Sequence, residues 1–159
     1  MSMREVVINA HDESLPAHSP LAEAAEAVWV AAQRSTWTSL VVVPAEAGLS
    51  TGPLAAAVAA VASAQRSETV EHLDLGSVAL ADSRPLAEKL AEKGKPYRYV
   101  ASVRCPLESQ TALLLSSAAH AAILVVERER TLLPSARRVL DLVGPDRFVG
   151  AVVVGPVPG

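Results

Sequence analysis

Residues 39–65, SLVVVPAEAGLSTGPLAAAVAAVASAQ, decide the fold. They open with an apolar run at 40–43 that ends at Pro44 and shows no alternation with polar residues. A β-branched run of this kind favours a strand that is covered on both faces, as in a parallel sheet. After a loop that contains Gly48, larger apolar residues recur among alanines at helical spacing: Leu54, Val58 and Val61. The stretch therefore predicts a buried strand, a loop and a helix that lies close against the sheet.

The loop between this strand and this helix has the placement of a P-loop, in which backbone N–H groups at a helix N-terminus hold phosphates. A working loop needs glycine for close backbone approach, lysine for the outer phosphates and Ser or Thr for magnesium. Gly48, Ser50 and Thr51 are present, but Leu49 occupies the lysine position. Losing that charge-assisted contact costs about 1.5 to 3 kcal/mol, and Glu46 would repel a polyphosphate. Two interpretations stay open, a degraded phosphate-binding loop and an ordinary turn from strand to helix.

The composition limits both the core and the partners. The 159 residues suit one domain, and because 50% are hydrophobic but only 3% aromatic, the core must be built from Ala, Val and Leu. The net charge of −3, without a long basic run, argues against nucleic acid or an anionic membrane surface as a partner. Cys105 is the only cysteine, which excludes an internal disulfide. No apolar stretch reaches membrane-spanning length, so we expect a cytoplasmic protein without direct membrane insertion.

Apolar strands and helical patterns alternate along the rest of the chain. Further strands are expected over 70–75, 97–103, 121–126 and 148–154, and further helices over 19–34, 107–117 and 134–143. A short helix is expected between a cap at Asp82 or Ser83 and a stop at Gly94 and Pro96. This order predicts an α/β fold, with a doubly wound, mostly parallel sheet of about five strands and helices on both faces. We expect this domain to span 19–159, after a flexible or edge arm at 1–18.

One acidic residue lies where ligands bind in open parallel sheets. Asp74 is near the end of the strand expected at 70–75, and the carboxyl edge of such a sheet is the usual ligand site. A solvated loop aspartate would have the same place in the sequence. His72 and His120 lack the spacing of metal ligands, so no metal site is expected.

Three large or reactive side chains have both a functional and a structural interpretation. Trp29 and Trp37 either pack in the core or leave one indole exposed enough to serve a protein partner. Cys105, on a loop before Pro106, is either a nucleophile or an incidental half-buried thiol.

Five segments stand in a particular order along 19–154. They are SPLAEA at 19–24, the loop at Gly48, the strand that ends near Asp74, YRYVASVRCPL at 97–107, and AAILVVERERTLLPSARRVLDLVGPDRFVGAVVV at 121–154. In this order and spacing the chain resembles the bacterial tyrosine kinases of capsule and exopolysaccharide synthesis, a branch of the P-loop ATPases. The resemblance implies a P-loop NTPase-like domain.

The same resemblance implies that most nucleotide and magnesium positions have been exchanged. The family's lysine falls at Leu49 and its magnesium-coordinating aspartate at Val103, while a second aspartate after Asp74 falls at Gly76. The asparagine that reads adenine in the family falls at or beside Val154. The remains of the cofactor site are Gly48, Ser50, Thr51 and Asp74. We expect no catalytic residue, no metal ligand and no bound cofactor.

In the family, the first helix carries Glu, Arg and Arg at three-residue spacing for ring assembly. Here Glu23 matches, while Glu26 and Trp29 replace the arginines. The resemblance therefore implies that Glu23, Glu26 and Trp29 form a protein interface. It also implies that the chain is a catalytically inactive pseudo-kinase, or pseudo-ATPase, which acts by protein–protein contacts in exopolysaccharide synthesis or export. Expected partners are a membrane polysaccharide co-polymerase or a sibling ATPase, and a homo-oligomer stays possible.

A second hypothesis keeps the cleft above the sheet as a ligand or nucleotide sensor without hydrolysis. It would use Ser50, Thr51, Asp74 and Arg104 to bind an anion or a nucleotide. Arg104 supports this hypothesis because its cation stands close to where the family holds magnesium. Retained enzyme activity is the third hypothesis, and no Ser, His and Asp arrangement in the sequence supports it.

Overall fold

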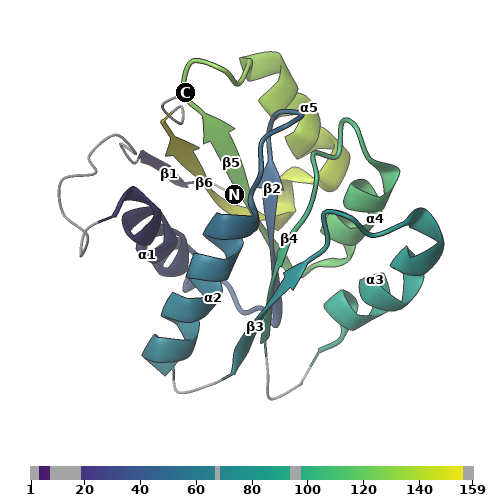
Figure 1. Cartoon of the computed structure of the whole chain (residues 1–159), viewed down its shortest axis with the longest axis horizontal. Helices are drawn as coiled ribbons and strands as arrows, with labels where there is room; N and C mark the ends of the chain where they lie inside the picture. Colours follow the sequence, from purple (N-terminus) through teal and green to yellow (C-terminus); the bar gives the residue numbers. More distant parts are fainter. Residues whose placement is uncertain (1–3, 8–18, 67–68, 94–97, 156–159) are drawn as a thin grey trace.

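The computed structural model describes residues 4–7, 19–66, 69–93 and 98–155. Its strands form one parallel six-stranded sheet in the order β1-β6-β5-β2-β4-β3, with every arrow pointing to the same edge (Figure 1). The strands are β1 (Arg4–Val7), β2 (Ser39–Pro44), β3 (Val70–Asp74), β4 (Arg98–Ser102), β5 (Ala121–Glu127) and β6 (Phe148–Val154). The α-helices are α1 (Pro20–Ala32), α2 (Gly52–Arg66), α3 (Ser83–Ala91), α4 (Gln110–Ala118) and α5 (Leu133–Val143).

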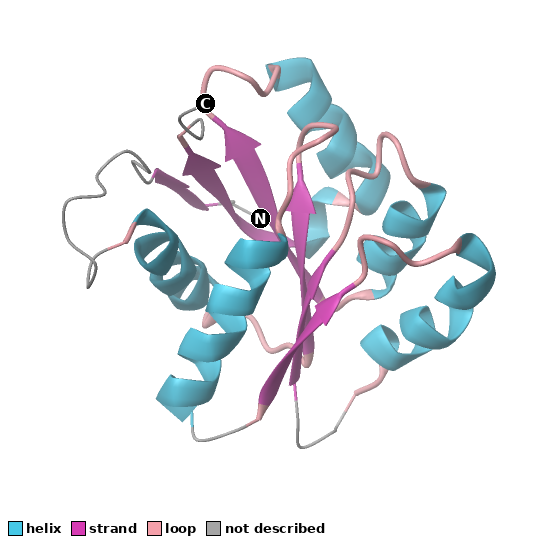
Figure 2. Cartoon of the chain, in the orientation of Figure 1, coloured by secondary structure: helices cyan, strands magenta, loops and turns pink. Residues whose placement is uncertain are grey.

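The strand β2 lies inside the sheet between β5 and β4, and all six of its residues are buried. Its side chains alternate between two apolar cores, because successive residues of a strand point to opposite faces. Leu40 and Val42 pack with α1 and α2, whereas Val41 and Val43 pack with α3, α4 and α5. Figure 2 shows these helices on the two sides of the strands. The unbroken apolar run at 40–43 thus reflects a strand with two covered faces.

Serine caps begin two of the helices. The Ala22 N–H donates to Ser19 Oγ at the start of α1, and the Ala112 N–H donates to Ser109 Oγ at the start of α4. Both bonds satisfy an amide that has no partner inside the helix. Gly144 ends α5 with φ 111°, a backbone conformation that side chains rarely allow.

The structure confirms the expected α/β fold, and β1 within the expected arm makes the sheet six strands wide. The helix expected from 107 begins only at Gln110, because residues 106–108 form a turn in which the Glu108 N–H donates to the Cys105 carbonyl at 3.0 Å. Parts of four other predictions lie outside the described residues: 1–3 and 8–18 of the arm, the helix stop at Gly94 and Pro96, the start of the strand at Tyr97, and 156–159. None of the helices that the structure describes is long and apolar enough to span a membrane.

Both tryptophans are buried, so of the two alternatives the one in which they pack in the core fits the structure. Trp29 is 7% exposed and Trp37 is 2% exposed. The two rings meet edge to face with centroids 6.4 Å apart, and Trp37 Nε1 donates to the Ala32 carbonyl at 3.0 Å. The Arg98 guanidinium lies 5.0 Å from the Trp37 ring centroid. These contacts fix the C-terminal end of α1 to the sheet.

Candidate functional site

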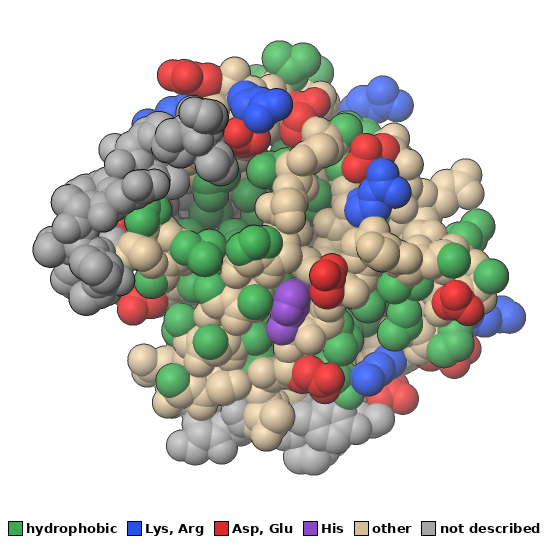
Figure 3. Space-filling view, viewed as in Figure 1, with side chains coloured by type: hydrophobic (Ala, Val, Ile, Leu, Met, Phe, Trp, Pro, Cys, Tyr) green, Lys and Arg blue, Asp and Glu red, His purple; other side chains and the backbone are tan. Residues whose placement is uncertain are grey.

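An open cavity of about 640 Å³ lies at the carboxyl edge of the sheet, between the loop after β2 and the ends of β3 and β4. Its lining combines the loop at 48–51, the first residues of α2 and the segments that follow β3 and β4. Figure 3 shows basic and acidic side chains interspersed on this face, with no gathering of Lys and Arg among the coloured atoms. The cavity includes the predicted residues Gly48, Ser50, Thr51 and Asp74. The structure therefore brings the four candidate cofactor-site residues together.

The Thr51 side chain is buried and stabilises the fold. It is 2% exposed, and its hydroxyl donates to the Val42 carbonyl at 3.0 Å and lies 3.4 Å from the Val103 carbonyl. The hydroxyl thus ties the start of α2 to the ends of β2 and β4. Ser50, by contrast, is exposed beside Gly48, which has φ 84° in the loop. Of the two hydroxyls, only that of Ser50 is accessible to a ligand.

The first part of the loop points away from this cavity. Glu46 Oε2 accepts a hydrogen bond from the Leu132 N–H at 3.2 Å, at the N-cap of α5. Glu46 also lines a separate pocket of about 270 Å³ together with Glu127 and Arg130. Leu49 is half-buried and packs against the core on the α1 and α2 side of the sheet. The position expected for a phosphate-binding lysine therefore carries an aliphatic side chain that contributes to packing.

Asp74 belongs to a hydrogen-bonded chain that spans two strands. Ser102 Oγ donates to Asp74 Oδ1 at 3.3 Å and lies 3.1 Å from His72 Nε2. Since a hydroxyl has one proton, His72 donates to Ser102 when Ser102 donates to Asp74. The Gly76 N–H adds a second bond to Asp74 Oδ1 at 3.3 Å. This network fixes the orientation of the Asp74 carboxylate.

Sequence reasoning missed the contribution of His72 and Ser102 to this site. The two residues are 30 positions apart and form no recognised motif. The parallel register places Asp74 opposite Ser102 and His72 opposite Val100. Side chains two residues apart in one strand point to the same face, which brings His72 and Asp74 to opposite sides of the Ser102 hydroxyl. Pairing the two expected strands in register would have indicated the contact.

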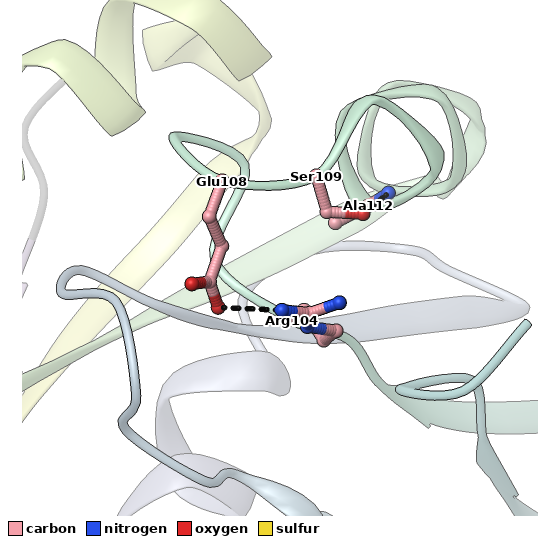
Figure 4. Close-up of polar contacts among 4 residues, drawn as sticks. All are labelled: Arg104, Glu108, Ser109 and Ala112. Carbon is pink, nitrogen blue, oxygen red and sulfur yellow. Dashed lines mark hydrogen bonds and ion pairs between the residues drawn. The ribbon is translucent and has the colours of Figure 1, made fainter.

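The segment after β4 places one aliphatic and two charged side chains near the cavity. Val103 is 3% exposed and belongs to the core on the α4 side. Arg104 Nη2 lies 3.6 Å from Glu108 Oε1, and Figure 4 shows this ion pair beside the Ser109 cap of α4. The Arg104 side chain is 57% exposed, so the pair is screened by water. The cation of Arg104 lines the cavity but already has an anionic neighbour.

Cys105 is buried in the same core, with 1% of its surface exposed. Burial raises the pKa of the Cys105 thiol, and the carboxylates of Glu108 and Glu46 raise it further, whereas a backbone hydrogen bond at Leu107 lowers it. A buried neutral thiol is a poor nucleophile. The alternative of an incidental thiol fits this geometry, although the side chain is fully buried and not half-buried as expected.

Two positions at which the resemblance to the tyrosine kinases expects nucleotide or magnesium ligands carry aliphatic side chains. Leu49 offers no charge to the outer phosphates, and Val103 offers no oxygen to a metal. The Thr51 hydroxyl is directed to backbone carbonyls. Within the described residues, no group of three or more His, Cys, Asp or Glu side chains is arranged to hold a metal ion.

The expected interface residues on α1 differ in exposure. Glu23 and Glu26 are exposed, whereas Trp29 packs in the core as described above. Neither α1 nor these residues line the cavity. The exposed part of this helix also carries Leu21 and Val30, which is 63% exposed.

Two kinase domains are among the solved structures that are similar to this chain. The VpsO kinase domain superposes with a TM-score of 0.62 at 14% identity, covering 87% of this chain and 95% of that chain. The BceF tyrosine kinase domain gives a TM-score of 0.61 at 14% identity, covering 86% of this chain and 76% of that chain. No protein-family model matches the chain, and no curated protein sequence matches it. The chain therefore has the fold of bacterial tyrosine-kinase domains of the VpsO and BceF type.

Proposed function

We propose that the chain is a catalytically inactive relative of the bacterial tyrosine kinases and acts through protein contacts in exopolysaccharide synthesis or export. The observation that carries this proposal is the content of the cavity at the carboxyl edge of the sheet. The cavity has the place of a nucleotide site in this fold, but it lacks a lysine at Leu49 and a carboxylate at Val103. Those two side chains contribute to packing instead.

The charges around the cavity also argue against the binding of a nucleotide triphosphate. Asp74 and Glu108 both line it, and the cation of Arg104 is paired with Glu108. Among the described residues of the lining, a triphosphate would meet two carboxylates, one arginine and no lysine. Because polyphosphates are held by lysine, magnesium and backbone N–H groups together, this site offers too little positive charge.

Contacts with other proteins would then be the remaining role of the domain. Candidate partners are a membrane polysaccharide co-polymerase, a sibling ATPase or another copy of the chain. The exposed residues Glu23 and Glu26 on α1 are suited to such a contact, and the buried Trp29 would hold that helix in place. An acidic helix surface would select a partner with basic residues.

Turnover of ATP tests the loss of catalysis. We expect no ATP hydrolysis and no phosphate transfer to tyrosine above a protein-free control, in the presence of magnesium. The variant Leu49→Lys is the matched control for the loop, and we expect it to stay inactive because Val103 still supplies no metal ligand. Magnesium-dependent turnover by the unmodified chain would overturn the proposal.

A ligand sensor is the second candidate function, and the His72–Ser102–Asp74 chain favours it. These groups orient the Asp74 carboxylate at an open cavity, and the same cavity is lined by the exposed Ser50. Fixed polar groups in a cavity are typical of ligand sites. Saturable binding of a nucleotide that depends on Asp74 but causes no turnover would favour the sensor over the protein-contact role.

A further inference from the structure

A pair of adjacent leucines stands out on the surface at the start of α5. Leu132 is 64% exposed and Leu133 is 67% exposed, and these are the most exposed large apolar side chains of the described chain. Leu133 is followed by Pro134, which is exposed as well. Single exposed leucines are ordinary on protein surfaces, but here two neighbours in the chain are both largely exposed at the start of a helix.

Four arginines lie within five residues of this pair in the sequence. Arg128 and Arg130 precede it in the loop after β5, and Arg137 and Arg138 follow it on the outer side of α5. All four are exposed. We call Leu132 and Leu133 together with these four arginines the leucine–arginine ridge.

The charge of this segment is opposite to that of the chain. Four arginines and two glutamates give residues 127–138 a charge of +2, so with a total of −3 the rest of the chain carries −5. Glu127 is also buried and lies 3.6 Å from Arg130, which leaves Glu129 as the exposed carboxylate of the segment. The Glu46 carboxylate also lies at Leu132, so the ridge combines two exposed leucines with four exposed arginines, which outnumber the carboxylates of Glu127, Glu129 and Glu46 beside them.

Local geometry holds the ridge in place. The Leu132 N–H donates to Glu46 Oε2, and Thr131 Oγ1 accepts from the Glu127 N–H at 2.8 Å. Glu129 has φ 69°, a conformation that is uncommon for residues other than glycine. A preorganised surface loses less entropy on binding than a mobile one.

We propose that the leucine–arginine ridge binds an acidic segment of another protein, with apolar side chains that cover Leu132 and Leu133. The inference rests on the proposed protein-contact function and names a surface for it that is separate from α1. Charge complementarity supports this occupant, because carboxylates pair with arginine in forked geometry. An anionic lipid surface is disfavoured by the charge of −5 on the rest of the chain, which would be repelled at the membrane.

Site-specific photo-crosslinking tests this assignment. Benzoylphenylalanine replaces Leu133 in the full chain, which is expressed in the cells that produce it, and the crosslinked peptide is identified by mass spectrometry. The control places the same group at Leu142, which is 44% exposed near the other end of α5. We expect a crosslink from position 133, and not from position 142, to a segment of another protein that contains both acidic and apolar residues.

The mapped segment is then synthesised with a fluorophore and titrated with the purified chain. The double variants Leu132→Ser/Leu133→Ser and Arg137→Glu/Arg138→Glu should each weaken its binding roughly tenfold or more. Leu142→Ser and Arg84→Glu, which alter exposed residues outside the ridge, should leave the affinity unchanged. The melting temperatures of the variants verify that each is folded.

Other results overturn the inference. These are a crosslink only to a second copy of this chain, to lipid or to a basic segment, equal crosslinking from 133 and 142, or an affinity that the ridge variants do not change. The ATP turnover assay is independent of these readouts. If the chain hydrolyses ATP, the proposal of an inactive role is refuted, but a contact mapped at the ridge still stands. If the chain is inactive and no crosslink forms at position 133, only the proposal about the ridge is refuted.

Discussion

Replacing Thr51 by valine tests whether this residue is part of the fold rather than of a ligand site. Valine keeps the shape of the side chain but removes the hydroxyl that donates to the Val42 carbonyl. Because the side chain is 2% exposed, water cannot replace that donor. The lost hydrogen bond and the unsatisfied acceptor should lower the free energy of unfolding by about 1–2 kcal/mol.

Urea unfolding followed by tryptophan fluorescence measures this change, since both tryptophans are buried in the folded chain. For a domain of this size the expected loss corresponds to a fall in melting temperature of roughly 2–8 °C. Ser50→Ala is the matched control, because Ser50 is exposed in the same loop, and its effect should stay within about 0.5 kcal/mol. The structural role of Thr51 would be refuted if the Thr51→Val variant were as stable as the unmodified chain. It would also be refuted if Ser50→Ala lowered the free energy of unfolding more than Thr51→Val did.

Three further substitutions test other parts of the account. Trp29→Ala should lower the free energy of unfolding by about 3–5 kcal/mol, because it removes a buried indole. The control Val30→Ser alters an exposed neighbour and should change the free energy of unfolding little. Equal effects of the two variants in urea titrations would contradict the buried placement of Trp29. His120→Ala should cost about 1–3 kcal/mol, because His120 Nδ1 accepts from the Thr38 N–H at 3.1 Å, and an unchanged urea midpoint would contradict that. Burial raises the pKa of the Cys105 thiol, so the folded state holds this proton more tightly than the unfolded state. Its contribution to stability should therefore decline as pH rises above the ordinary cysteine value of about 8.5, and Cys105→Ala should show a flatter dependence in urea titrations from neutral to alkaline pH.

The sequence predicted the strands inside the sheet well because their composition leaves few alternatives. The runs at 40–43 and 121–126 are apolar without alternation, and the structure places both in adjacent buried strands. The strand expected at 148–154 has the same bounds as β6. In such segments the requirement for two covered faces and the local preference for β structure agree.

Other features depended on contacts that no local pattern reveals. Leu107 and Glu108 suit a helix, but the turn closed by the Cys105 carbonyl delays α4 to the Ser109 cap. Trp29 is buried in a core where its ring meets that of Trp37, eight residues beyond it in the chain. These placements follow from tertiary packing, which overrides local preference.

The candidate site could be predicted in part. The loop at Gly48 and the strand end at Asp74 were recognisable because both lie at the carboxyl edge of a parallel sheet. Sequence alone gave Thr51 the same role as Ser50, although only the folded chain distinguishes a hydroxyl bound to Val42 from an exposed one. The contact between His72 and Ser102 required the register of β3 and β4.

Calorimetric titration of magnesium–ATP into the purified chain tests the central claim most directly. With Leu49 and Val103 in place of a lysine and a carboxylate, we predict no saturable heat of binding, which corresponds to a Kd weaker than about 1 mM. Saturable binding in the micromolar range that is lost when magnesium is removed would contradict the claim, because it would mean that the cavity still holds a metal–nucleotide complex.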